Sequence, residues 1–258
     1  MEKEFIVDVE VTLYCNQDCR HCINRISDKQ YTLQDDSIDF NKLYVFLEKL
    51  ISVKKNIKLI LNGGEPTLHP DLLLFCEKIN TLNNKSNNKI NIWLFTNFSQ
   101  DISYYKLILN KHLHLVFTYH SSLFTVNEFK TKLSQLPKDK CHIIFMLDSD
   151  ISELINEFND YQYEVRIFEN KIYDKTLVEK FFNIKTYQYK NKNLKAICRL
   201  TDDYIYIDES GIIYKCMFNM TPVGLITDFK FNFLNKKLIM CDNNNCHYSY
   251  GKLIHGKN

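Results

Sequence analysis

Apolar positions in residues 5–169 follow two alternating spacings. Six short runs rich in β-branched or apolar residues predict strands over 5–13, 57–61, 90–95, 113–119, 142–146 and 163–168. Between them, apolar residues recur every three or four positions, which predicts helices over 39–53, 71–82, 104–109, 126–136 and 151–158. This alternation favours parallel strands joined by right-handed crossovers. We therefore expect an α/β fold whose functional loops gather at the carboxyl ends of the strands.

The alternation ends near residue 170. Residues 171–197 are rich in Lys, Tyr and Asn and show no clear period, so we interpret them as a connecting segment. A β-hairpin is predicted next, with strands over 203–207 and 212–215 and its turn at Gly211. The sequence thus predicts an α/β domain over 1–170, a connection over 171–197, and a small hairpin-containing unit over 198–258.

Composition narrows the class of protein. The chain has 258 residues, of which 45% are hydrophobic, as in a packed soluble protein. Its net charge of +2 gives no electrostatic support for binding to nucleic acid or to a membrane surface. No apolar run reaches the length of a membrane span, and the charged start, Met1–Glu4, is not typical of a signal peptide. We expect a cytoplasmic protein, in which nine cysteines favour metal or redox chemistry over disulfides.

Cys15, Cys19 and Cys22 follow the first predicted strand with the spacing C-x3-C-x2-C. Thiolates this close on one loop can hold a single metal centre. They would ligate three irons of a four-iron cluster and leave the fourth open to a small molecule. The alternatives are a zinc site or unrelated structural cysteines. Structural zinc usually takes four protein ligands in paired units, and a fourth cysteine is missing nearby.

A second motif, Asn62-Gly-Gly-Glu-Pro-Thr67, follows the second predicted strand. Gly63 and Gly64 allow the backbone to approach a ligand closely, and Pro66 stiffens the turn. Glu65 would present its carboxylate to an ammonium group, or only to solvent. By itself such a run is more often an ordinary turn. Its place at the same edge of the sheet as the cysteine loop favours a cofactor site.

Together the cysteine spacing and the Gly-Gly-Glu-Pro run resemble the radical S-adenosylmethionine (radical SAM) enzymes. The resemblance implies a partial (βα)6 barrel, a [4Fe-4S] cluster with an open iron, and S-adenosylmethionine bound there with its amino group near Glu65. His21 stands where relatives usually have an aromatic or apolar residue near the adenine. Four polar residues at later strand ends are also expected at the cofactor, although each could instead be a capping, packing or surface residue: Asn97, His120, Ser121 and Arg166.

Four cysteines late in the chain form a second candidate centre. Cys198, Gly211 and Cys216 are separated by twelve and four residues, which resembles the opening of the SPASM and twitch extensions of radical SAM enzymes. Cys241 and Cys246 would complete the ligands of one auxiliary iron–sulfur cluster, of the [4Fe-4S] type, so twitch is the closer match. A zinc site with the same thiolates, or buried unligated cysteines, are the alternatives. We interpret the other two cysteines as core residues: Cys76 and Cys141.

The resemblance implies an enzyme that reductively cleaves S-adenosylmethionine to a 5′-deoxyadenosyl radical, which abstracts a substrate hydrogen atom. We expect a two-electron oxidation or a rearrangement of a small molecule, with electrons from a flavodoxin or ferredoxin. Oxidation needs a base, and three carboxylates are candidates by placement: Asp148, Glu169 and Asp203. A peptide maturase that crosslinks or epimerises residues is the first alternative, disfavoured because the chain begins almost at the first strand. A non-catalytic iron–sulfur or zinc scaffold is the second, disfavoured because it needs no cofactor turn.

Overall fold

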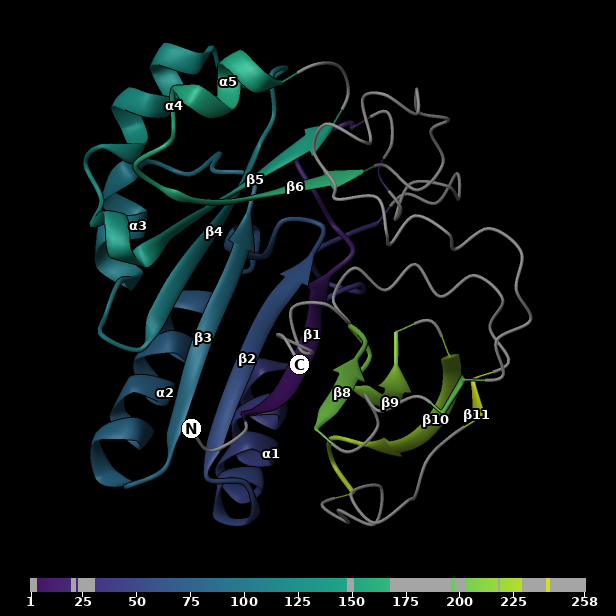
Figure 1. The fold of residues 1–258 in the computed structure, drawn as a ribbon. Helices are drawn as coiled ribbons and strands as arrows, with labels where there is room; N and C mark the ends of the chain where they lie inside the picture. The colour runs from purple at the N-terminus through teal and green to yellow at the C-terminus, as the bar shows by residue number, and fades with distance from the viewer. Residues whose placement is uncertain are drawn as a thin grey trace.

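The computed structural model describes residues 4–19, 22, 31–147, 151–167, 196–197, 203–217, 219–228 and 240–241. Six parallel strands lie side by side in chain order (Figure 1): β1 (Phe5–Thr12), β2 (Asn56–Gly63), β3 (Lys89–Thr96), β4 (Leu113–Tyr119), β5 (Cys141–Leu147) and β6 (Gln162–Ile167). The connections between them carry α1 (Phe40–Val53), α2 (Leu72–Lys85), α3 (Ile102–Ile108), α4 (Val126–Leu133) and α5 (Ser152–Asn156). Short 3-10 turns lie at η2 (Pro66–Leu68) and η3 (Lys138–Lys140). The predicted α/β class and parallel strand order are confirmed.

Two helices end at residues other than those that the spacing of apolar residues predicted. Helix α2 continues to Lys85, although the sequence predicted a loop from residue 83. Asn83 is fully buried, and its side-chain amide bonds both the N–H and the carbonyl of Ile90, at 2.8 Å each. This contact with the start of β3, seven residues further along the chain, holds the helix past the last apolar residue in phase. In the other direction, α4 ends at Leu133, before the predicted residue 136.

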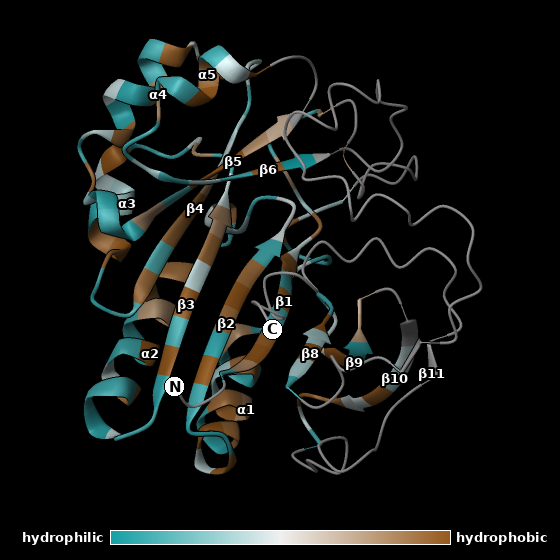
Figure 2. Ribbon diagram, in the orientation of Figure 1, coloured by the Kyte–Doolittle hydropathy of each residue, from teal (hydrophilic) through white to brown (hydrophobic). Residues whose placement is uncertain are grey.

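The helices lie along one face of the sheet, and hydrophobic residues recur along both in the ribbon of Figure 2. Buried residues of the helices and strands form one core. Val7 and Val9 of β1 and Leu43 and Leu47 of α1 are each 0% exposed and belong to one continuous core. Burying such side chains stabilises the fold by roughly 1.5–3 kcal/mol each. This core fixes the strands, and therefore the loops at their carboxyl ends.

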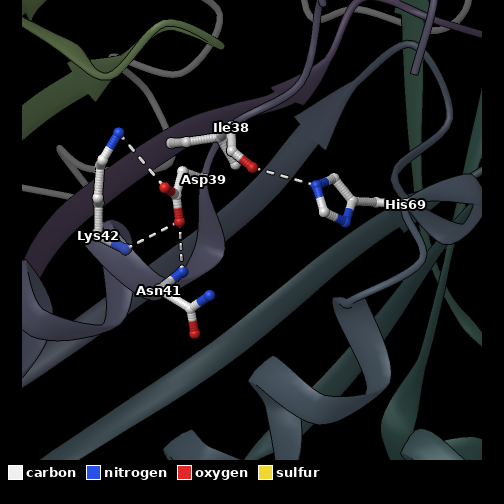
Figure 3. Close-up of polar contacts among 5 residues, drawn as sticks. All are labelled: Ile38, Asp39, Asn41, Lys42 and His69. Atoms are coloured by element: carbon white, nitrogen blue, oxygen red, sulfur yellow. Dashed lines mark hydrogen bonds and ion pairs between the residues drawn. The ribbon is translucent and has the colours of Figure 1, made fainter. Parts of the chain in front are cut away.

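Helix α1 begins after an N-cap residue, Asp39. The side chain of Asp39 accepts hydrogen bonds from the backbone N–H groups of Asn41, at 2.9 Å, and Lys42, at 3.2 Å (Figure 3). The cap satisfies donors that the first turn of a helix leaves unpaired. Helix α4 begins with a reciprocal capping box between Thr125 and Glu128. These caps set where each helix leaves the loop that precedes it.

The predicted C-terminal hairpin forms, but it is part of the large sheet. Strand β8 (Tyr204–Ile207) pairs parallel to β1, while β9 (Ile212–Cys216) and β10 (Asn219–Leu225) follow antiparallel. The full order of the nine strands is β10-β9-β8-β1-β2-β3-β4-β5-β6. Gly211 closes the turn with a φ of 83°, a conformation that favours glycine. The hairpin thus extends the barrel sheet beyond its first strand.

A second, two-stranded sheet pairs β7 (Ala196–Ile197) with β11 (Met240–Cys241). The predicted boundaries at residues 170 and 198 stay predictions, since most of that region lies outside the described residues. Within the part of the chain that the structure describes, none of the helices combines the length and apolar character needed to span a membrane.

Candidate functional site

The stem of the cysteine loop rests directly on the two glycines of the second motif. Gly64 N–H donates to the carbonyl of Thr12 at 2.6 Å, and Glu65 N–H donates to that of Tyr14 at 2.8 Å. A Cβ at Gly63 would lie 2.3 Å from the Thr12 oxygen, and one at Gly64 would lie 2.1 Å from the Tyr14 oxygen. The sequence assigned these glycines to close approach of a ligand. In the structure they are required first by the close approach of the backbone that leads into Cys15.

Glu65 is directed into the protein. It is 0% exposed and accepts four hydrogen bonds, from the N–H and hydroxyl of Thr67, the hydroxyl of Thr96 and the N–H of Asn97. Burial raises the pKa of this carboxyl, and the hydrogen bonds oppose the rise. The expectation that its carboxylate faces an ammonium group or solvent is therefore wrong. The side chain ties the turn after β2 to the end of β3 and leaves only backbone of the motif to meet a ligand.

The end of β3 is turned by an unusual residue. Phe98 has a φ of 64°, which is uncommon for a bulky side chain. The Phe98 ring is fully buried, and its centroid lies 4.0 Å from the centroid of the Phe117 ring. Lys132 Nζ donates to the backbone carbonyl of Phe98 at 2.6 Å. This packing holds the backbone turn in place. The turn leaves the preceding residue, Asn97, beside the cysteine loop, where its Nδ2 donates to Asn16 Oδ1 at 2.8 Å.

The three loop cysteines are half-buried. Cys22 N–H donates to the carbonyl of Cys19 at 3.0 Å. Side chains from two strand ends reach the sulfurs. His120, after β4, places Nδ1 3.7 Å from Cys19 Sγ, and Asn97 places Nδ2 3.9 Å from Cys15 Sγ. The loop that carries the cysteines is thus in contact with the carboxyl ends of β2, β3 and β4, as the sequence predicted for a parallel sheet.

The donor set of this loop fits an iron–sulfur cluster in its chemistry. Burial, followed by the charges of Cys15 and Cys22, raises the pKa of the Cys19 thiol to about 11. The three sulfurs therefore interact electrostatically, and a bound cation would offset the repulsion between their thiolates. Among the residues that the structure describes, no three His, Cys, Asp or Glu side chains are arranged as ligands of one metal ion. The fit rests on three thiols of one loop and on the N–H donors around them.

The turn after β2 is also tied to the segment that enters α1. His69, directly after η2, lies against the start of that helix with its Nε2 3.1 Å from the carbonyl of Ile38 (Figure 3). Its Nδ1 accepts the N–H of Asp71 at 3.1 Å. Burial lowers the pKa of this histidine, so it stays neutral at pH 7. This contact holds the end of the cysteine-containing connection that enters α1, while Gly64 and Glu65 hold its start.

Three other predicted cofactor residues take different surroundings. Pro66 begins η2 and is buried. Ser121 lies in the exposed turn after β4. Arg166 lies near the end of β6, 5.4 Å above the ring of Phe95, and donates from Nε and Nη2 to the two carboxylate oxygens of Glu164 at 3.0 and 3.1 Å. Its fork of donors is thus engaged by a neighbouring carboxylate. Contact of these residues with a cofactor stays a prediction.

The candidate base Asp203 lies at the wrong end of the sheet. Its carbonyl accepts the N–H of Ile6 at 2.7 Å, beside the start of β1, whereas the cysteine loop follows the other end of that strand. The 8 residues of β1 separate the two ends by roughly 25 Å at about 3.3 Å per residue. This removes the reason for assigning Asp203 to the site. The parallel pairing of β8 with β1, which the sequence did not predict, causes the error. Asp148 and Glu169 lie outside the described residues, as does His21.

The C-terminal cysteines are only partly described. Cys216 ends β9 and is 8% exposed. Cys241 belongs to β11, whose backbone pairs with Ala196 two residues before Cys198 in the chain. Cys198 and Cys246 lie outside the described residues. The auxiliary cluster therefore stays a prediction. Cys76 and Cys141, predicted as core residues, are each 2% exposed.

The structure reveals acidic residues on the inner face of β1 that the sequence interpretation missed. The Asp8 carboxylate, which is 3% exposed, accepts hydrogen bonds from Tyr204, at 3.0 Å, and from Asn62. Glu10 accepts one from Tyr206. Burial raises the pKa of Asp8 to about 7, against the effect of the Tyr204 bond. The alternation Val-Asp-Val-Glu-Val over residues 7–11 is the signal that would have identified them.

Comparison with known proteins supports the fold. No protein-family model matches the chain, and no curated protein sequence matches it either. Among solved structures, anSMEcpe with bound AdoMet superposes with a TM-score of 0.64 and 16% identity, over 95% of this chain and 82% of that one. SuiB from Streptococcus suis, bound to precursor peptide SuiA, gives 0.61 and 15% over 100% of this chain and 68% of that one. BtrN in complex with AdoMet and 2-DOIA gives 0.51 and 18%, over 100% and 85%.

These three proteins are radical SAM enzymes. At identities below 25% the likeness establishes the fold, and the chain therefore has the radical SAM partial-barrel fold that its sequence predicted.

Proposed function

We propose that this protein is a radical SAM enzyme whose site lies between the cysteine loop and the turn after β2. The observation that carries the proposal is the direct contact of these two motifs, in which Gly64 and Glu65 donate backbone hydrogen bonds to the loop stem. A zinc or structural site formed by the cysteines alone would not require this turn. The radical SAM fold and the AdoMet present in anSMEcpe and BtrN support the same conclusion.

The residues of this chain have separate tasks in the proposal. Cys15, Cys19 and Cys22 hold a [4Fe-4S] cluster with one open iron. The backbone of the Gly63–Glu65 turn meets the methionine part of S-adenosylmethionine, because the Glu65 carboxylate is directed inward. A cluster held there would supply, when reduced, the electron for reductive cleavage of S-adenosylmethionine. The protein holds the substrate C–H bond near that radical and excludes water.

The inner face of the sheet supports a polar substrate. It carries Asp8 and Glu10 on β1, which accept hydrogen bonds from Tyr204 and Tyr206. A two-electron oxidation or rearrangement of a small molecule is the function we favour. An auxiliary cluster bound by Cys198, Cys216, Cys241 and Cys246 would accept the electron that the substrate gives up after losing its hydrogen atom. A cytoplasmic flavodoxin or ferredoxin would supply the electron that reduces the cluster of the cysteine loop.

Peptide modification is the second candidate. It is favoured by the likeness to SuiB bound to precursor peptide SuiA and to anSMEcpe with AdoMet and a bound peptide. A short precursor peptide encoded beside this gene would support it over a small-molecule reaction.

Iron analysis and electron paramagnetic resonance (EPR) test the cluster assignment. Anaerobically reconstituted wild type should bind about eight irons if both clusters form, and about four if only the first does. Replacing Cys15, Cys19 and Cys22 by Ala should remove about four of them, together with the change that added S-adenosylmethionine causes in the EPR spectrum. Cys76→Ala, a matched change in the core of α2, should keep the full iron content. Retention of all iron by the triple variant would refute the assignment.

A further inference from the structure

Side chains at the ends of β3 and β4 place nitrogen atoms within hydrogen-bonding distance of the cysteine sulfurs. His120 Nδ1 lies 3.7 Å from Cys19 Sγ, and Asn97 Nδ2 lies 3.9 Å from Cys15 Sγ. Within the loop, Gln17 N–H donates to Cys15 Sγ at 3.4 Å. The sequence interpretation placed Asn97 and His120 at S-adenosylmethionine. In the structure both contact the sulfurs of the candidate cluster ligands, and their contact with S-adenosylmethionine stays a prediction.

The protein holds the backbone of His120 and both the backbone and the side chain of Asn97. The His120 carbonyl accepts the N–H groups of Leu123, at 2.9 Å, and Phe124, at 3.2 Å, which fixes the turn after β4. Asn97 N–H donates to the buried Glu65 at 2.6 Å, and its Oδ1 accepts the N–H of Ser99 at 3.0 Å. Since these bonds are made within the fold, the two donors are already directed at the loop before any ligand binds.

Donors to ligand sulfur act on the redox chemistry of an iron–sulfur cluster. A reduced cluster carries one more negative charge than an oxidised one, so a hydrogen bond to its sulfurs stabilises the reduced form more. We propose that His120 and Asn97 set the reduction potential of the proposed [4Fe-4S] cluster by donating to Cys19 and Cys15. A ligating thiolate carries no proton and can only accept, so the proton of the neutral imidazole lies on Nδ1. The inference rests on the cluster of the proposed function, and not on its substrate or reaction.

Raising the potential has a direct consequence for the electron donor. A less negative cluster is reduced by a weaker reductant, while the electron it then holds drives cleavage of the sulfonium less strongly. The donors at Cys19 and Cys15 would balance these two demands. His120 is expected to dominate, because its contact with sulfur is the shorter of the two side-chain contacts.

A redox titration followed by EPR, without S-adenosylmethionine, tests the proposal on reconstituted protein. His120→Leu removes the donor and should shift the cluster potential to a more negative value. His120→Asn places an amide Nδ2 near the position of Nδ1 and should restore a potential close to that of wild type. Asn97→Ala should shift the potential in the same direction as His120→Leu, by less.

Ser99→Ala is the matched control. Ser99 Oγ accepts from Asn16 Nδ2 at 3.0 Å and so tethers the same loop without touching a sulfur in the described contacts. The cluster potential of Ser99→Ala should equal that of wild type, and all variants should bind the same number of irons per chain.

Two results would overturn the inference. One is a His120→Leu potential equal to wild type; the other is an equal shift in Ser99→Ala, which would trace the effect to loop position. Failure of the proposed function is distinguishable, because a wild-type cluster that titrates normally without cleaving S-adenosylmethionine would leave the potential comparison intact. A wild type that holds no cluster would refute both.

Discussion

Glycine at positions 63 and 64 is set by backbone contact within the protein. The loop stem passes so close that a Cβ at Gly64 would meet the carbonyl oxygen of Tyr14 at 2.1 Å. A backbone atom cannot rotate away as a side chain can. The turn after β2 and the cysteine loop therefore act as one unit, and a residue that the sequence suggests for ligand contact also has a structural role. Glu65 likewise has a structural role, because its carboxylate accepts hydrogen bonds from within the protein.

Gly64→Ala should therefore damage the cysteine loop. We expect a loss of about 3 kcal/mol or more in the free energy of unfolding, typical of a severe overpacking, and loss of bound iron because the loop stem is displaced. Gly211→Ala is the comparison. That residue has a φ of 83°, and its added Cβ would lie 2.9 Å from Ile226 Cδ1, a side-chain atom that can move.

The Gly211→Ala control should lose about 1–2 kcal/mol in the free energy of unfolding and keep its iron. Urea unfolding and iron analysis of both variants give the answer. A Gly64→Ala protein as stable as wild type, with full iron, would contradict the close contact.

At the scale of elements, β1 carries two opposite faces. Val7 and Val9 pack on the helices, while Asp8 and Glu10 bond the tyrosines of β8. These bonds join the C-terminal hairpin to the barrel from the inner face. The period of two within β1 was visible in the sequence, but its partner was not, because β8 lies almost 200 residues later in the chain. The alternation of residues within a strand predicts that the strand has an apolar and a polar face. It does not predict which distant strand will pair with it.

Asp8 gives this junction a dependence on pH. Burial raises its pKa from 3.8 to about 7, against the effects of Tyr204 and Asn62, with Glu10 adding to the rise and Arg166 opposing it. Lys58 also acts on Asp8 electrostatically. Because the folded pKa exceeds the unfolded one, the contribution of Asp8 is fully present below about pH 4 and is lost as pH rises through 7.

Asp8→Asn removes this ionisation, and the amide of Asn62 can turn to accept from it. The free energy of unfolding of wild type should fall relative to the variant between pH 5 and 8, with an upper limit on the order of 4 kcal/mol. Asp160→Asn, at an exposed ion pair with Lys138, is the control and should change in parallel with wild type. Urea titrations across this range provide the measurement. Parallel curves for wild type and Asp8→Asn would contradict the buried state of Asp8.

For the whole molecule, the sequence predicted the parts whose signals are local. The six parallel strands, their helices and the meeting of the two motifs all follow from periodicity and order along the chain. The direction of Glu65, the placement of Asp203 and the union of hairpin and barrel depend on strand pairing between distant segments. Those features were missed or wrongly predicted for that reason. The meeting of the cysteine loop with the turn after β2 was thus predictable, and the side chains that hold the two together were less so.

The central claim is that the loop after β1 and the turn after β2 together activate S-adenosylmethionine. The most direct measurement is the yield of 5′-deoxyadenosine from reconstituted protein, S-adenosylmethionine and dithionite under anaerobic conditions. Wild type should form it, and the variant in which Cys15, Cys19 and Cys22 are Ala should form none. A wild-type protein with a reducible four-iron cluster that leaves S-adenosylmethionine intact would contradict the account.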